Sequence, residues 1–305
     1  MPPVRATTLY TQPISDSEVK RVWGHLKLNK MAMAGLLIIM VFIICALFAP
    51  LLAPYSPFQT DFSQVLQSPS GQNWLGTDWL GRDVLSRIIY GARISLAIGF
   101  ISVTIGMIIG VPIGALSGYF SGRFDIFTQR FIDILLAFPG ILLAIVIVAI
   151  MGAGIRNVMI AVGIVSIPIY ARLVRGSVMA VKEEGFIMAA KSLGIGDFRI
   201  IIRHVLPNCL GPIIVQSTFQ VATAILWAAG LGFLGLGAQP PDPEWGAMLS
   251  KGREYIRVAH HLTTYPGLTI LFMVLGFNLL GDGLRDALDP RTREFKEVKN
   301  RYFKL

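Results

Sequence analysis

Charged side chains are scarce in this chain. Asp, Glu, Lys and Arg make up 15% of its 305 residues, whereas 54% are hydrophobic. Soluble domains carry about 25% charged residues, so this composition excludes an ordinary soluble protein. Cysteine is scarcer still, because only Cys45 and Cys209 are present, each in or beside a long apolar segment. Their positions and spacing predict neither an extracytoplasmic disulfide nor a metal site.

Several motifs for catalysis and energy coupling are also missing. The chain has no Gly-x-x-x-x-Gly-Lys-Ser/Thr phosphate loop, which excludes an ATPase, and no His-Glu-x-x-His or Gly-x-Ser-x-Gly, which argues against a hydrolase. The His260-His261 pair lacks further metal ligands. Residues 230–235 fit Gly-x-Gly-x-x-Gly without a preceding strand, which favours helix packing over a dinucleotide site. We therefore expect no enzyme activity, metal or cofactor on this chain, with an intramembrane hydrolase or a membrane scaffold as the alternative class.

Six apolar segments are long enough to cross a hydrocarbon core of about 30 Å. They lie at 35–52, 94–116, 131–151, 158–173, 210–235 and 266–284, and Pro168 falls inside the fourth. No Asp, Glu, Lys, Arg or His occupies the centre of a segment, where proton-driven transporters place such groups. The sequence therefore predicts an all-α, polytopic membrane protein with six transmembrane helices that takes its energy from another subunit.

Lys and Arg are distributed unevenly between the two sides of the membrane. With the N-terminus inside, 20 of the 27 fall in cytoplasmic segments, so the positive-inside rule favours two cytoplasmic termini. The net charge of +9 follows from this asymmetry, and no nucleic-acid partner is predicted. The expected organisation is a cytoplasmic segment at 1–30, a first helix with an extracytoplasmic loop at 31–90, a five-helix core at 91–290 and a cytoplasmic tail at 291–305.

The cytoplasmic loop at 178–209 has the pattern of a helix-turn-helix. Four apolar residues recur at helical spacing and predict one apolar face. They are Phe186, Ala189, Ala190 and Leu193. Gly194 is placed to break that helix, Asp197 to cap a second one and Pro207 to end it. Because helices this short are marginal alone in water, we expect them to pack against a partner subunit.

This loop resembles the EAA loop of ABC-importer permeases, whose consensus is Glu-Ala-Ala, three residues, Gly, nine residues, Ile, one residue, Leu-Pro. The residues in register are Ala189, Ala190, Gly194, Leu206 and Pro207. Met188 stands in place of the Glu and His204 in place of the Ile. Residues 73–87, with Leu-Gly-Thr-Asp-Trp-Leu-Gly-Arg-Asp at their centre, resemble a signature of peptide and nickel permeases, and residues 281–291 extend the resemblance. The chain is thus similar to the C-type permease subunit of dipeptide and oligopeptide importers.

The resemblance implies a type I ABC-importer permease of the cytoplasmic membrane, whose five-helix core contains the EAA coupling loop at 178–209. It also implies a homologous second permease, two cytoplasmic ATPase subunits that hold ATP and Mg, and an extracytoplasmic solute-binding protein that contacts the loops at 55–86 and 238–265. The ATPases are expected to dock on the coupling loop. Its candidate residues are Phe186, Met188, Ala189, Ala190, Gly194, Asp197, Leu206 and Pro207. Di- or oligopeptides are the expected substrates, and nickel chelates or glutathione are the alternatives.

Two stripes of residues are candidates for a role in transport. Glycine recurs every four residues in the second apolar segment, which lets another helix approach closely and serves either static packing or a gating hinge. These residues are Gly106, Gly110, Gly114 and Gly118. A polar stripe in the fifth segment either lines the transport path or joins neighbouring helices. Its members are Gln216, Gln220, Thr223 and Trp227.

Overall fold

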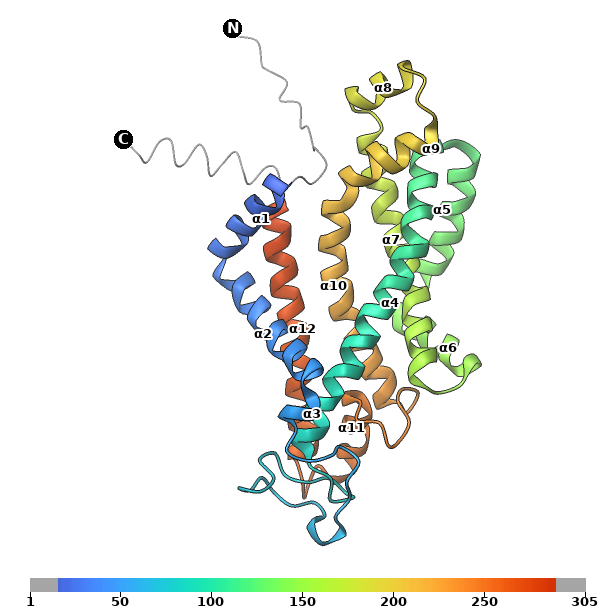
Figure 1. Ribbon diagram of the computed structural model, residues 1–305. Helices are drawn as coiled ribbons and strands as arrows, with labels where there is room; N and C mark the ends of the chain where they lie inside the picture. The colour runs from blue at the N-terminus through green and yellow to red at the C-terminus, as the bar shows by residue number, and fades with distance from the viewer. Residues whose placement is uncertain (1–15, 289–305) are drawn as a thin grey trace, which may run out of the picture.

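The computed structural model of the chain describes residues 16–288 (Figure 1). The tail predicted at 291–305 and the first half of the segment predicted at 1–30 lie outside the described residues. Within 16–288 the fold is built of helices and loops without a β-strand, as predicted. The α-helices are α1 (Asp16–Leu28), α2 (Lys30–Leu47), α3 (Ala49–Leu52), α4 (Val84–Phe120), α5 (Gly122–Ala137), α6 (Gly140–Met151), α7 (Ile155–Val181), α8 (Gly185–Ser192), α9 (Asp197–Ile200), α10 (Leu206–Phe233), α11 (Trp245–Gly252) and α12 (His261–Leu288).

Five described helices are long and apolar enough to cross a membrane, and a bent pair supplies a sixth span. The five are Lys30–Leu47, Val84–Phe120, Ile155–Val181, Asp197–Phe233 and His261–Leu288. The bent pair is α5 and α6, which meet at 89°. The prediction of one continuous helix at 131–151 was therefore wrong, although the count of six holds when the pair is taken as one span.

The break between α5 and α6 has a local cause. Phe138 precedes Pro139 and adopts extended backbone, with ψ of 136°, because a proline ring crowds the residue before it out of the helical region. Pro139 also lacks an N–H to donate to the preceding turn, so α5 ends at Ala137 and α6 begins afresh at Gly140.

The second and fourth spans also differ from the predicted ranges. The second begins ten residues earlier, at Val84, because the Asp83 side chain accepts the backbone N–H of Ser86 at 2.7 Å and so caps α4. The fourth runs from Ile155 to Val181 and continues through Pro168 without interruption. Both helices extend beyond the apolar segments that hydropathy detects, and the added turns contain polar residues.

The four glycines of the predicted stripe lie where α4 packs against α7. A Cβ added at Gly106 would lie 2.6 Å from the Cβ of Ser166, and one added at Gly110 would lie 2.6 Å from the carbonyl oxygen of Ile167. The other two glycines face the backbone of α7 in the same way. Real side-chain atoms do not approach so closely, so the separation of these two helices depends on the missing side chains.

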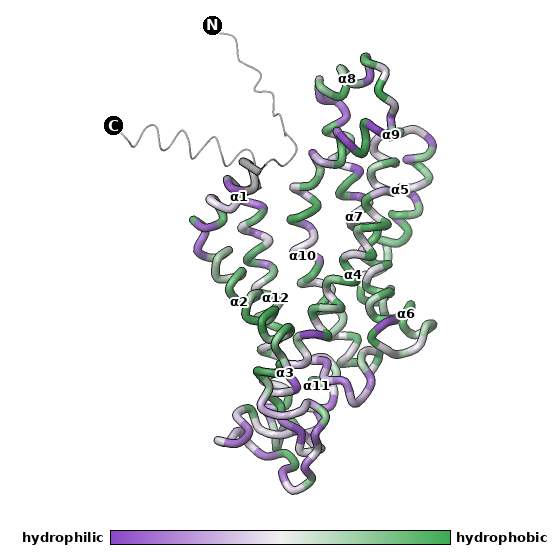
Figure 2. Tube along the Cα trace, viewed as in Figure 1, coloured by the Kyte–Doolittle hydropathy of each residue, from purple (hydrophilic) through white to green (hydrophobic). Residues whose placement is uncertain are grey.

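The two ends of the bundle differ in chemistry. One end carries α1, the last turn of α12 and a projection formed by α8 and α9 (Figure 1). At the other end, residues 53–83 and 234–260 form a cap of loops around α3 and α11. Figure 2 shows hydrophobic residues along α2, α4 and α6 and many hydrophilic residues gathered in this loop cap.

Candidate functional site

The predicted helix-turn-helix is present and projects from one end of the bundle. We call α8, α9 and the π-helical turn Ile201–Val205 the coupling hairpin. Gly194 adopts a φ of +76° directly after α8, a left-handed conformation that favours glycine at a helix C-terminus. The turn between the two helices therefore has the geometry that the sequence predicted.

Two details of the predicted hairpin were wrong. Asp197 makes no capping hydrogen bond to the backbone of α9; its Oδ1 instead accepts a hydrogen bond from the Tyr119 hydroxyl at 2.7 Å. Pro207 does not end the second helix, because α9 continues through the π-helical turn into α10, and Leu206 and Pro207 lie in the first turn of that helix. Pro207 lacks a backbone N–H, and it lies where the hydrogen-bond pattern changes from the π-helical turn to the α-helix.

The hairpin has a buried face and an exposed apolar face. Ile187 and Ala190 are buried, and Phe186 packs beside them at the edge of the core. Ala189 is exposed, as are larger apolar side chains, so the predicted single apolar face was wrong in register. The exposed large residues are Met188 at 57%, Leu193 at 80%, Phe198 at 67% and Ile202 at 65%. Exposed apolar side chains gathered on one projection are typical of surfaces that contact another protein or a membrane.

The coupling hairpin is fastened to the end of α4. In addition to the bond between Tyr119 and Asp197, the Lys191 ammonium lies 4.9 Å from the centre of the Tyr119 ring. The Phe120 and Phe198 rings meet edge to face at 6.3 Å. Since cation–π and aromatic contacts each stabilise by about 1 kcal/mol, the hairpin and α4 are held together as one unit.

A second fastening lies below the hairpin, between α5 and α7. Arg175 donates Nε and Nη2 to the two carboxylate oxygens of Asp125 at 2.6 and 2.7 Å. Ser117 of α4 donates to the same carboxylate. This two-pronged geometry is the strongest form of the arginine–carboxylate pair, and it ties three helices together where α7 leads into the hairpin.

The four residues of the polar stripe on α10 make different kinds of contact. Gln220 is 2% exposed and donates Nε2 to Ser166 of α7 at 2.9 Å, so it joins two helices. Thr223 donates its hydroxyl to the carbonyl of Phe219 in its own helix at 3.0 Å. Trp227 lies against Gly140 at the start of α6, and Gln216 is half-buried. Gln220 thus fits the helix-joining alternative, whereas the path-lining role of Gln216 stays a prediction.

The loop cap contains a buried cluster of charges on the 73–87 motif. Asp78 accepts the backbone N–H groups of Leu80 and Arg82 at 2.8 and 3.0 Å and the Nε of Arg82 at 2.7 Å. Arg87 donates Nη1 to the carbonyls of Pro57 and Pro241, at 2.9 and 3.3 Å. The motif therefore folds both segments of the loop cap onto the start of α4.

A buried carboxyl holds α11 against the end of α10. Glu244 is 2% exposed, and its two oxygens accept the backbone N–H groups of Gly246 and Ala247 at 2.7 and 2.8 Å. Burial raises the pKa of Glu244 from 4.5 to about 7, against the opposing effect of these two hydrogen bonds. The carboxyl therefore keeps its proton to a higher pH than an exposed glutamate does.

Comparison with known proteins now decides the family. Residues 110–294 match the family described as binding-protein-dependent transport system inner membrane component, and residues 17–69 match the N-terminal transmembrane domain of oligopeptide transport permease C. The chain belongs to this permease family. Its relatives are permease subunits of transport systems, so this permease is a transport subunit and not an enzyme.

Several relatives match the permease over most of its length. It is 53% identical to the dipeptide transport system permease protein DppC of Alkalihalophilus pseudofirmus over 274 residues, which is 90% of each chain. The di/tripeptide permease DppC of Pseudomonas aeruginosa is 48% identical and covers 93% of this chain and 98% of its own length. The glutathione permease GsiD of Escherichia coli is 49% identical, over 89% of this chain and 90% of that one.

A solved structure supports the fold. The MetNI methionine ABC transporter, in an inward-facing conformation, matches 67% of this permease and 96% of its own chain with a TM-score of 0.55 and 20% identity. This likeness confirms the helical importer fold predicted from the sequence.

Sequence reasoning missed several residues that position the site. Tyr119 and the Arg175–Asp125 pair lie far from their partners in the chain, so no local pattern exposes them. Glu244 gave no clear signal, because Asn, Asp, Ser and Thr are the usual N-cap residues and Glu is not. The sequence predicts a loop at 238–265 that contacts a binding protein, and helix α11 inside it was not predicted.

Proposed function

We propose that this permease forms half of the translocation path of an ATP-driven importer of small peptides. The observation that carries the proposal is the exposed apolar face of the coupling hairpin. Two ATPase subunits would dock on this hairpin and on its counterpart in a homologous second permease. ATP and Mg would bind to those ATPases and not to this chain, which has no phosphate loop.

The orientation in the membrane is part of the same proposal. The hairpin, the start of α1 and the end of α12 lie at one end of the bundle (Figure 1), where the Lys and Arg distribution predicts the cytoplasm. The loop cap then lies outside the cytoplasm, where a solute-binding protein would deliver substrate. Both chain termini would be cytoplasmic in this arrangement.

The second permease has a suitable surface to contact. An open apolar groove runs between α10 and α12, with the single amide of Asn278 among its aliphatic side chains. The residues that line it are Leu226, Gly267, Ile270, Leu271, Val274, Leu275 and Asn278. Small residues and single amides of this kind are frequent where helices associate within a bilayer.

The substrate follows from the relatives. The names of the three relatives described above refer to the transport of dipeptides, of di- and tripeptides, and of glutathione. Glutathione is itself a tripeptide, so small peptides are the chemistry that these permeases share, and glutathione import is the second candidate function. Nickel chelates, the other alternative from the sequence, have no counterpart among these relatives.

The proposal is tested by assembly and uptake. The tagged permease is extracted gently from its native membrane, and the bound proteins are identified by mass spectrometry. We expect a second permease, phosphate-loop ATPases and a binding protein, and ATP-dependent uptake of labelled di- or tripeptide after reconstitution. Recovery of the chain alone, under conditions that preserve other membrane complexes, would refute the importer.

A pair of variants tests the hairpin itself. Leu193→Asp places a charge on the most exposed apolar residue of the coupling hairpin, whereas Leu193→Met preserves apolar contact. The Asp variant should lose the ATPases on extraction because burying an unpaired carboxylate in the interface is costly, and the Met variant should retain them. Equal recovery of ATPases with both variants would show that they dock elsewhere.

A further inference from the structure

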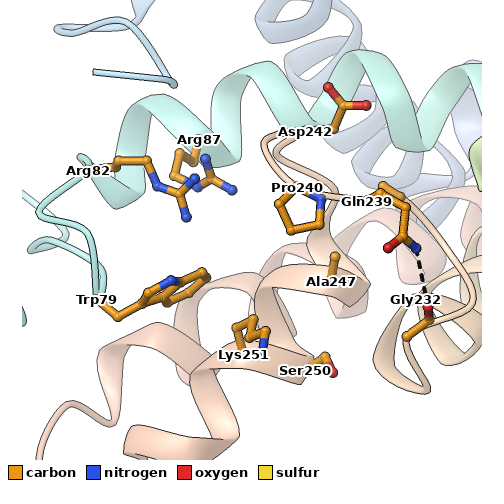
Figure 3. Close-up of a pocket in the computed structure, with 12 residues that line it drawn as sticks. Trp79, Arg82, Arg87, Gly232, Gln239, Pro240, Asp242, Ala247, Ser250 and Lys251 are labelled. Carbon is orange, nitrogen blue, oxygen red and sulfur yellow. Dashed lines mark hydrogen bonds between the residues drawn. The ribbon is translucent and has the colours of Figure 1, made fainter. Parts of the chain in front are cut away.

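A pocket of about 120 Å³ opens in the loop cap (Figure 3). It lies between the start of α4, the end of α10 and α11, so all of its walls come from this one chain. Figure 3 shows the guanidinium groups of Arg82 and Arg87 turned toward the space above Trp79 and Lys251. The polar stripe of α10 lies elsewhere, since Gln220 precedes the pocket residue Gly232 by twelve positions, or about 18 Å along a helix.

Cationic side chains outnumber carboxylates in the lining of the pocket. The lining includes Arg82, Arg87 and Lys251 and one carboxylate, Asp242. Asp78 pairs with both arginines and Glu254 with Lys251, so the pocket offers an anion free N–H donors and not a large net positive charge.

The two arginines are buried but incompletely bonded. Arg82 and Arg87 are 4% and 3% exposed. Arg82 gives its Nε to Asp78, whereas its two terminal nitrogens make no hydrogen bond within residues 16–288. The Nε of Arg87 has no hydrogen-bond partner in the same part of the chain and lies 3.6 Å from Asp78. Of these nitrogens only the Nε of Arg87 is fully buried without a hydrogen-bond acceptor, which is costly. The terminal nitrogens of Arg82 line the pocket and are available to an incoming acceptor.

The side chain positions are fixed before any ligand binds. The Arg82 guanidinium lies 5.0 Å from the centre of the Trp79 ring, and Trp79 stacks on Tyr255 at 6.4 Å with parallel planes. Arg87 is held by the carbonyls of Pro57 and Pro241. A pre-organised pair of planar donors suits a carboxylate, which accepts two parallel N–H bonds from a guanidinium.

From this geometry we propose that the pocket binds an acidic side chain, Asp or Glu, of the solute-binding protein. The proposal rests on the importer function proposed above and names a contact within it. The pocket admits a side chain but encloses too little space for a peptide, and it stands at the end of the bundle where the binding protein would arrive. Its Arg82 and Arg87 form the deep contact, and Lys251, half-exposed at the rim, attracts the incoming carboxylate.

Charge reversal at the rim gives the first test. In the assembled transporter, reconstituted in nanodiscs, Lys251→Glu should weaken binding of the solute-binding protein by about tenfold, because it places repulsion beside the incoming carboxylate. Arg257→Glu is the matched control: the same charge change, on an exposed residue of the same segment that does not line the pocket. Lys251→Arg should bind as the unaltered protein does. Equal weakening by both Glu variants, or by neither, overturns the proposal.

Cross-linking identifies the occupant. A carbodiimide joins the Lys251 amine to a contacting carboxylate as an amide. The experiment uses a Glu254→Gln background, because Glu254 lies 3.3 Å from the same amine. We expect mass spectrometry to find Lys251 linked to an Asp or Glu of the binding protein, and Lys251→Arg to abolish the link. A link to the carboxyl group of a transported peptide, or no link at all, overturns the proposal. Failure of the unaltered transporter to assemble or to bind a binding protein would instead refute the importer function.

Discussion

The contact between α4 and α7 depends on a missing side chain at Gly110, which makes one substitution decisive. In Gly110→Ala, the added Cβ would lie 2.6 Å from the carbonyl oxygen of Ile167 and 2.7 Å from the Cβ of Tyr170. Such a carbon–oxygen contact normally measures about 3.3 Å or more, so the helices must separate by about 0.7 Å. No rotamer change relieves the clash, because one atom belongs to the backbone and the other is fixed to it.

The expected loss of stability can be bounded. Overpacking of a well-packed contact costs about 1–3 kcal/mol, and a backbone clash belongs at the upper end of that range. Replacing glycine by alanine within a helix returns about 1 kcal/mol, so the net loss is about 2 kcal/mol. For a chain of 305 residues, whose unfolding entropy is about 0.64 kcal/mol/K, that corresponds to a fall in Tm of about 3 °C.

The assay is thermal unfolding of the purified permease in detergent, followed by intrinsic fluorescence and by the size-exclusion peak that survives heating. Gly176→Ala is the control, since Gly176 lies in α7 with no atom within 4 Å of the added Cβ. We expect its Tm to be unchanged or slightly raised. A Gly110→Ala protein as stable as the control would refute the packing argument. If such a protein also lost uptake, the glycine stripe would be a gating hinge instead.

Three further predictions concern single contacts. The pKa of Glu244 is raised by folding from 4.5 to about 7, so its protonation stabilises the fold by about 3 kcal/mol below pH 4.5, and this contribution is lost as the pH rises through 7. The Tm should fall from pH 5 to pH 8 in the unaltered protein and stay flatter in Glu244→Gln, which retains a capping oxygen. Asp125→Asn should lower the Tm more than Arg175→Lys, because the half-buried Arg175 then loses one of its two oxygen acceptors and the opposite charge; equal losses would contradict the bidentate pair. Gln216→Leu should reduce peptide uptake in liposomes without lowering the Tm, whereas an unchanged uptake would remove Gln216 from the path.

Local patterns predicted the elements that depend on short segments of sequence. The turn at Gly194 was predicted because only a few residue types tolerate a left-handed conformation. The bent span was missed although Pro139 marks it, because apolar residues continue on both sides and hydropathy averages over the break. Hydropathy averaged over a window of residues detects an apolar segment but does not detect a change in the direction of the chain within it.

Contacts between distant residues account for the other errors. Asp197 has the position of an N-cap, but its carboxylate accepts a hydrogen bond from the Tyr119 hydroxyl, which is 78 residues away in the chain. Gln220 likewise belongs to a polar stripe on its own helix, but its amide donates a hydrogen bond to Ser166 of another helix. In both cases the residue type predicted that the side chain would form a hydrogen bond. Its partner could not be predicted, because the partner depends on how the helices pack.

One helix connects the two regions on which the proposals rest. α4 runs without interruption for 37 residues, or about 55 Å, from its cap at Asp83 to Tyr119. Arg87 of the pocket lies in its first turn, and Tyr119, in its last turn, holds the coupling hairpin. An ATPase at the hairpin and a binding protein at the loop cap would thus contact opposite ends of the same rigid element. Because coupling between two binding sites is reciprocal, any factor by which nucleotide changes the affinity for the binding protein must equal the factor by which the binding protein changes the affinity for nucleotide.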